Sequence, residues 1–280
     1  MMNGRLPRQI KSQEPMEFEA VTVNRQGEII ARETHRAQQY VEDLGGGVLL
    51  ELVVIPGGTF LMGSPRGYGY PDERPQHRVT VAPFLMAKYP VTQEQWKAVM
   101  GWLPPCRCKG ARRPVDRVSW KDATEFCEQL SSKTGRVYRL PSEAQWEYAC
   151  RARTTTPFYC GETITTDLAN YVGEHTYLLE PKGIYRHEAT KVGSFPPNPF
   201  GLYDMHGNVW EWCADPWHED YTGAPADGRV WESDRDTSHR VMRGGSWHDP
   251  PNLCRCAVRL KFNPAEGEDF FGFRVMTAPS

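Results

Sequence analysis

Two acidic residues and a glycine turn lie close together in residues 200–212. Asp204 and Glu211 carry hard oxygen ligands, and Gly207 between them permits a turn that leaves backbone carbonyls free. A carboxylate, free carbonyls and a second carboxylate are ligands that Ca²⁺ prefers in proteins. The spacing alone nevertheless favours an ordinary turn between buried aromatic residues.

The cysteines and histidines give a second set of candidate ligands, with eight of each in the chain. Two cysteine pairs have C-x-C spacing, not the C-x-x-C spacing of common zinc and redox sites: Cys106 with Cys108, and Cys254 with Cys256. We expect reduced thiols, because no secretion signal is evident. Cys150 falls in a predicted helix and is expected to be a small buried hydrophobe. A lone histidine such as His206 is expected to be a hydrogen-bonded structural residue.

Hydrophobic patterning predicts an α+β domain with short strands, few helices and much irregular loop. Strands are predicted over residues 48–55, 59–63 and 79–85. Helices are predicted over residues 93–100, 120–133 and 143–153, with Thr92, Ser119 and Ser142 as their N-caps. Residues 159–199 give few periodic signals and are expected to be irregular. Such a mixture is typical of the α+β class.

Before the first of these strands, the sequence divides into two short parts. Residues 1–16 are predicted to be a disordered leader. Residues 17–47 are predicted to be an extension in which residues 18–23 and 28–32 form a β-hairpin. A helix capped by Thr34 and ending near Leu44 should follow it. Residues 48–280 would then form the main domain.

The charge balance excludes some classes of partner. With 33 basic and 35 acidic side chains the formal net charge is −2, so there is no global electrostatic reason to bind nucleic acid or an anionic membrane. No apolar run is long enough for a membrane span. The polar N-terminus lacks the apolar core of a signal peptide, and we expect a cytoplasmic protein.

The stretch GLYDMHGNVWEW, residues 201–212, resembles the signature of the formylglycine-generating-enzyme (sulfatase-modifying-factor) family. Further matches follow in the family's order: Ile55-Pro56-Gly57-Gly58-Thr59-Phe60, Glu73-Arg74-Pro75-Gln76-His77, Pro90-Val91-Thr92, Val118-Ser119-Trp120, Arg139-Leu140-Pro141-Ser142-Glu143-Ala144, Arg243-Gly244-Gly245-Ser246-Trp247 and Gly272-Phe273-Arg274-Val275. The resemblance implies a C-type-lectin-like variant of the α+β class for residues 48–280. In bacterial relatives, extensions like residues 17–47 join this module to signalling modules. A signalling partner for the extension is therefore one expectation, and simple packing on the domain is the other.

The resemblance also implies where metal ions bind. A structural Ca²⁺ would be held by Asp204, the carbonyls of Gly207 and Val209, and Glu211. Another calcium site of the family would use Asn170 and Tyr171. The acidic ligand expected downstream of Tyr171 has no clear match in this chain.

Catalytic members of the family bind Cu(I) through two cysteines that follow the Gly-Gly-Ser motif, and they oxidise a cysteine of a protein substrate to formylglycine with O₂. Here Asp249 occupies the first cysteine position, and Cys254 lies five residues beyond it. Counted back from Arg255 instead, the loop is shorter than the catalytic pattern, and Cys254 matches no thiol. Either count leaves at most one of the two soft ligands that Cu(I) needs. The sequence therefore predicts a non-catalytic chain. The alternative is a copper oxidase that uses Ser246, Cys254 and Cys256.

Residues 243–274 further resemble the variable region of retroelement-diversified proteins, which are non-catalytic users of this fold. In an extended segment, Arg255 and Arg259 would face one way and hold the loop, while the alternate residues would be displayed. The predicted ligand-binding face comprises Trp247, His248, Asp249, Cys254, Cys256, Val258, Leu260 and Phe262. Displayed apolar groups favour a protein as the ligand.

Overall fold

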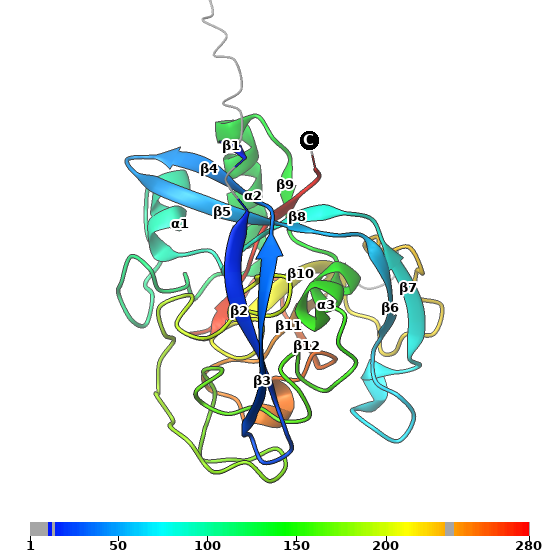
Figure 1. Cartoon of the computed structure of the whole chain (residues 1–280). Helices are drawn as coiled ribbons and strands as arrows, with labels where there is room; N and C mark the ends of the chain where they lie inside the picture. Colours follow the sequence, from blue (N-terminus) through cyan, green and yellow to red (C-terminus); the bar gives the residue numbers. More distant parts are fainter. Residues whose placement is uncertain (1–10, 13–14, 233–237, 280) are drawn as a thin grey trace, which may run out of the picture.

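The computed structural model describes residues 11–12, 15–232 and 238–279 (Figure 1). The predicted leader falls mainly on residues 1–10, which lie outside the described residues. Within the described ranges, no helix is long and apolar enough to cross a membrane.

An antiparallel six-stranded sheet contains strands from both ends of the described chain (Figure 1). Its order is β1 (Lys11–Ser12), β4 (Gln39–Gly45), β5 (Val48–Ile55), β8 (Phe84–Ala87), β14 (Met276–Thr277) and β9 (Tyr138–Arg139). β5 is the strand predicted over residues 48–55, and Leu52 and Val53 at its centre are fully buried. The single strand predicted over residues 79–85 is wrong. The chain forms β7 (His77–Val81), breaks at Pro83 and resumes as β8, because proline cannot donate to a strand ladder.

Three helices pack against the sheets: α1 (Gln93–Met100), α2 (Trp120–Thr134) and α3 (Glu143–Arg151). Each begins with a capping box at its predicted N-cap, which confirms all three helix starts. α1 and α2 meet through stacked rings, with the centroids of Trp96 and Phe126 5.4 Å apart. α3 is buried along its whole length, so its polar residues need partners inside the protein.

A second, four-stranded sheet carries three of the candidate site residues, Glu211, Leu260 and Phe262. Its order is β12 (Arg259–Phe262), β11 (Arg240–Arg243), β10 (Trp210–Pro216) and β13 (Phe271–Gly272). Two hairpins complete the strands: β2 (Met16–Val23) with β3 (Ile29–Ala37), and β6 (Gly58–Met62) with β7. Two 3₁₀ turns, η1 (Pro71–Glu73) and η2 (Pro251–Leu253), stand beside them.

The N-terminal extension contributes β4 to the main sheet, and its β2–β3 hairpin forms a sheet of its own. The β2–β3 hairpin confirms the predicted hairpin, but the helix predicted from Thr34 to Leu44 is wrong, because the end of β3 and all of β4 occupy those residues. Glu42 and Leu44 are buried while Asp43 between them is exposed. This period-two burial against β5 outweighs the helical spacing of the apolar residues. The predicted leader is also wrong for Lys11 and Ser12, which pair with β4.

Between α3 and β10, the described chain contains no helix or strand, as predicted for residues 159–199. Buried side chains hold this segment in place. Glu180 accepts hydrogen bonds from the N–H of Leu178 at 2.9 Å and from the hydroxyl of Thr163 at 2.5 Å. Asn198 donates to the carbonyl of Ala149 at 2.7 Å. Polar contacts thus replace regular backbone pairing over this long segment.

Candidate functional site

The turn at residues 204–208 is bonded to two distant segments. The N–H of Gly207 donates to the carbonyl of Gly244 at 2.8 Å, and the N–H of Asn208 donates to the carbonyl of Asn170 at 2.8 Å. Gly207 has a φ of 70°, and a Cβ there would lie 2.2 Å from the Asn170 oxygen. Only glycine fits this position, because any side chain would collide with that backbone.

The two carboxylates predicted as calcium ligands have different surroundings. Glu211 accepts from Nε and Nη2 of Arg274, both at 2.6 Å, and from Nε1 of Trp146 at 2.7 Å. Its charge is therefore already neutralised by a guanidinium. Asp204 is buried and accepts from the N–H of Gly193 at 2.8 Å, and burial raises its pKa to about 6. The structure gives Asp204 no ion pair within the described residues, whereas Glu211, the other predicted acidic ligand, is occupied by Arg274.

Asn170 and Tyr171, the other predicted calcium ligands, lie against this turn. Nδ2 of Asn170 donates to the carbonyl of Glu188 at 2.9 Å, but its Oδ1 is buried and accepts no hydrogen bond in the described structure. The Tyr171 hydroxyl donates to the carbonyl of Ile164 at 2.9 Å. A buried oxygen without a partner is costly, and a hard cation would satisfy it.

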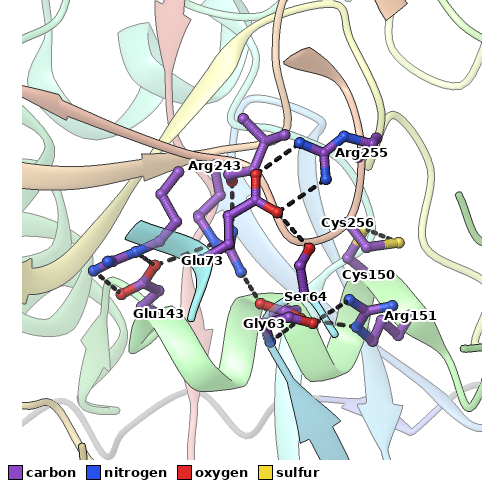
Figure 2. A network of polar contacts seen from close by, with 12 residues as sticks. Gly63, Ser64, Glu73, Glu143, Cys150, Arg151, Arg243, Arg255 and Cys256 are labelled. Carbon is purple, nitrogen blue, oxygen red and sulfur yellow. Dashed lines mark hydrogen bonds and ion pairs between the residues drawn. The ribbon is translucent and has the colours of Figure 1, made fainter. Parts of the chain in front are cut away.

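Buried ion pairs connect α3 to the end of the chain (Figure 2). Glu143 accepts from Nε of Arg259 at 2.6 Å and from Nη2 at 3.0 Å. Glu147 accepts from Nε of Arg151 at 2.8 Å and from Nη2 of Arg243. These side chains are almost completely buried, so each charge depends on its partner for stability.

A further pair holds the loop after the Gly-Gly-Ser motif. Arg255 donates to both carboxylate oxygens of Glu73, at 2.7 and 2.9 Å, and the hydroxyl of Ser64 donates to the same group (Figure 2). Arg255 and Arg259 thus hold their segment by hydrogen bonds, which confirms the role predicted for the two arginines.

The predicted ligand-binding face is wrong at four of its residues, one of which is Trp247. Cys254, Cys256 and Val258 are each 0 % exposed and pack in the core. The physical reason is that residues 251–258 are not an extended strand. η2 and the turns after it end the period-two alternation on which the prediction rests.

The other four predicted residues are more accessible. His248 is exposed, and Asp249, Leu260 and Phe262 are half-buried. Trp247 is 3 % exposed and lies beneath a group of surface rings. His248 stacks on Phe270 with centroids 5.4 Å apart, and Tyr185 stacks over Trp247 at 6.3 Å. We call Tyr185, His187, Trp247, His248 and Phe270 the aromatic surface.

Asp249 and Cys254 are the residues that, counted from the Gly-Gly-Ser motif, match the two copper-binding cysteines of the catalytic members. Oδ2 of Asp249 accepts from Nε1 of Trp210 at 2.8 Å and from the hydroxyl of Ser246. The thiol of Cys254 lies 3.8 Å from the carbonyl of Pro250. Burial, and then the charge of Asp249, raise the pKa of Cys254 well above its usual value. Without a metal ion the thiol form of Cys254 is therefore favoured over the thiolate, which is the form that binds metals.

Cys150, His206 and Cys256 form a buried cluster whose three ligand atoms lie within 4.8 Å of one another. The two sulfurs are 3.6 Å apart, and Nδ1 of His206 is 4.0 Å from the Cys150 sulfur. Thiolates and imidazole suit zinc or Cu(I). However, Nε2 of His206 accepts from the N–H of Tyr159 at 3.0 Å, so a neutral ring carries its proton on Nδ1 and donates toward the sulfurs.

This arrangement favours a thiolate at Cys256. Burial acts to raise the pKa of Cys256, but the hydrogen bond from Cys150 and the nearby His206 outweigh it and hold that pKa well below its usual value. Burial and the same contact raise the pKa of Cys150. The sequence treated Cys150 and His206 as structural residues, and only the fold brings them to Cys256. The one feature of the sequence that could have indicated this cluster is the position of His206 next to Gly207 in the turn.

Comparison with known proteins gives the family. Residues 47–279 match the family described as the sulfatase-modifying factor enzyme 1-like domain. The serine/threonine-protein kinase pkn1 of Chlamydia pneumoniae is 32 % identical over 257 residues, covering 81 % of this chain and 38 % of the kinase. The chain thus spans well under half the length of that relative.

Two solved structures share the fold. PvdO from Pseudomonas aeruginosa has a TM-score of 0.74 at 35 % identity, over 85 % of this chain and 98 % of PvdO. Variable protein 1 of Treponema denticola has a TM-score of 0.71 at 24 % identity, over 86 % of this chain and 99 % of the other, and at that identity the likeness concerns the fold alone. The fold is thus the α+β, C-type-lectin-like variant that the sequence predicted, and the chain belongs to the sulfatase-modifying factor enzyme 1-like family.

Proposed function

We propose that this chain is a non-catalytic, ligand-binding domain of its family. One observation carries the proposal, namely that a carboxylate, Asp249, stands where the first of two thiolates would be needed. Asp249 is held by Ser246 and Trp210, and so it is part of the fold and not a mobile side chain. Cu(I) requires soft ligands, and this loop supplies at most one.

Neither Cys256 nor Ser246 supplies the missing copper ligand. Cys256 faces Cys150, with the sulfurs 3.6 Å apart, and takes its hydrogen bonds there. Ser246 donates to Asp249 and is also already engaged. The alternative catalytic set of Ser246, Cys254 and Cys256 is therefore divided between two separate environments.

We place the ligand on the aromatic surface in place of the wider face predicted from sequence. Its rings are held by neighbours, since Arg107 lies 4.9 Å above the Trp247 ring and is itself paired with Asp269 at 2.9 Å. Rigid aromatic side chains flanked by arginine are enriched where proteins bind proteins, and we propose a protein ligand. Diversification at Cys254, Cys256 and Val258 is disfavoured, because buried core positions do not tolerate free variation.

We also propose that Ca²⁺ stabilises this domain. Support comes from the unpaired buried carboxylate of Asp204 and the unsatisfied Oδ1 of Asn170, which lie on segments joined by a hydrogen bond from Asn208.

We further propose a cytoplasmic location for the protein and a signalling partner for its N-terminal extension.

The binding proposal is tested by capture from cell lysate with matched variants. Tyr185→Ala and His248→Ala should lose a captured protein that the unaltered chain retains, while their melting temperatures stay unchanged. Leu179→Ala, which alters an exposed apolar residue elsewhere, is the control and should retain it. Equal capture by all four proteins would contradict the assignment of the aromatic surface.

A further inference from the structure

A concave region elsewhere in the protein shares no residue with the aromatic surface. It is a cleft of about 660 Å³ between β6 of the β6–β7 hairpin and the segment that follows α3. Its walls include Gly58, Phe60, Arg78, Tyr148, Arg151 and Arg153. All three charged residues that line it are arginines, so the cleft is positively charged although the whole chain has a net charge of −2.

Two of these arginines have no acidic partner in the part of the chain that the structure describes. Arg151 is paired with Glu147 at 2.8 Å, and its charge is neutralised. Arg78 and Arg153 are exposed and form no ion pair with a described residue. Arg153 only approaches the face of Phe200, at 5.7 Å. Most other arginines near the cleft are held by carboxylates, so this free pair is a local excess of positive charge.

The backbone at the end of α3 also presents Arg153 in an uncommon conformation. Ala152 and Arg153 have φ values of 43° and 77°, in the left-handed region that non-glycine residues rarely adopt. Two such residues in succession cost free energy, which the surrounding structure must offset.

The strand on the other wall has an unpaired edge. β6 pairs with β7 and with no other described strand, so its second edge offers free N–H and C=O groups. Phe60 of β6 packs against Tyr148 of α3 with ring centroids 5.4 Å apart, which gives the cleft an apolar base. Such an edge can pair with an added extended peptide.

The cleft also continues in both directions. Pro65, Gln76, Arg151 and Thr155 are shared with a second hollow that reaches Arg255, and Arg153 and Thr154 are shared with a third that reaches Phe200. A row of connected hollows suits an elongated ligand better than a compact anion.

We propose that this cleft binds an acidic peptide segment in extended conformation. Its backbone pairs with the free edge of β6, its carboxylates meet Arg78 and Arg153, and an intervening apolar side chain rests on Phe60 and Tyr148. Arginine is the residue best suited to bidentate recognition of carboxylates.

The test is fluorescence anisotropy with a labelled peptide of alternating Glu and Val residues. We expect saturable binding that weakens as salt rises, and no binding of the matching Gln–Val or Lys–Val peptides. Arg78→Glu and Arg153→Glu should each raise the dissociation constant by at least about tenfold, with unchanged melting temperatures. Arg25→Glu, at an exposed arginine outside the cleft, should leave it unchanged.

Several results would overturn the proposal. Equal binding of the Gln–Val peptide would remove the role of charge, and equal weakening by Arg25→Glu would show that only net charge matters. Complete competition by citrate or inorganic phosphate at concentrations matched for charge would identify a small-anion site. Equally tight binding of single-stranded DNA would show that the cleft binds a phosphate backbone and not specifically an acidic peptide.

Discussion

Arg259 of β12 and Glu143 of α3 are joined by two hydrogen bonds, at 2.6 and 3.0 Å, although 116 residues separate them in the sequence. Both side chains are almost completely buried, and the hydroxyl of Tyr221 donates to the same carboxylate at 2.9 Å. This contact fixes the end of the Gly-Gly-Ser region onto the helix that underlies it.

Arg259→Ala should therefore destabilise the protein by about 3–5 kcal/mol, because it leaves a buried carboxylate without its partner. Chemical denaturation followed by tryptophan fluorescence measures the change in the free energy of unfolding. Arg229→Ala removes an exposed ion pair with Asp227 and should change that free energy by less than about 0.5 kcal/mol. Equal effects of the two substitutions would refute the role given to the buried pair.

Val258→Asp should unfold the domain. Val258 is fully buried in the same core cluster as Phe271 and Phe273, and an unpaired carboxylate there should cost more than about 4 kcal/mol. Circular dichroism and thermal melting measure the outcome, with Lys261→Ala on the exposed side of β12 as the control. A folded Val258→Asp protein would restore the wider ligand-binding face predicted from sequence.

Asp215 should make stability depend on pH. Burial, and then the charge of Glu143, raise its pKa to about 7, while an unfolded aspartate titrates near 3.8. The folded state therefore binds this proton more tightly than the unfolded state. The stabilisation that results is fully present below about pH 4 and is lost as the pH rises to about 7. In Asp215→Asn this position no longer titrates, so it contributes the same free energy at every pH. Compared with that variant, the natural chain should lose up to about 4 kcal/mol of its free energy of unfolding between about pH 4 and pH 7. Parallel stability profiles for the two proteins would contradict this assignment.

Removing Ca²⁺ should lower the melting temperature. An ion that binds only the folded state stabilises it by mass action, by about 2.7 kcal/mol at one hundred times the dissociation constant. Asp204→Ala should abolish the difference between calcium-containing and chelator-containing buffer, whereas Asp227→Ala, at an exposed acid, should preserve it. Identical melting curves of the natural chain in both buffers would exclude a calcium site.

Local signals in the sequence predicted the elements that depend on local chemistry. The capping boxes at Thr92, Ser119 and Ser142, and the apolar run of β5, act within a few residues and were predicted correctly. The helix predicted over residues 34–44 failed because pairing with β5 overrode a spacing that also fits a helix. The motif resemblance supplied the overall fold, which these local signals could not.

The candidate site depends on contacts between distant residues, and this explains what the sequence missed. Arg274 reaches Glu211 across 63 residues, and Cys256 reaches Cys150 across 106. No spacing rule connects such residues, so the commitment of Glu211 to a guanidinium and the pairing of the two thiols were not predictable. Arg78 and Arg153 of the cleft are likewise recognised only because no acidic side chain pairs with them, and this can be seen only in the folded structure.

The most direct test of the central claim is an oxidation assay with Cu(I), O₂ and a reductant. A synthetic peptide containing Cys-x-Pro-x-Arg is incubated with the chain and analysed by mass spectrometry. We expect the peptide mass to stay that of the thiol, because Asp249 and Cys254 together supply only one of the two thiolates of a copper bis-thiolate site. Conversion of the cysteine to an aldehyde by the natural chain, and its loss in Cys254→Ser, would contradict the account and identify the protein as an oxidase.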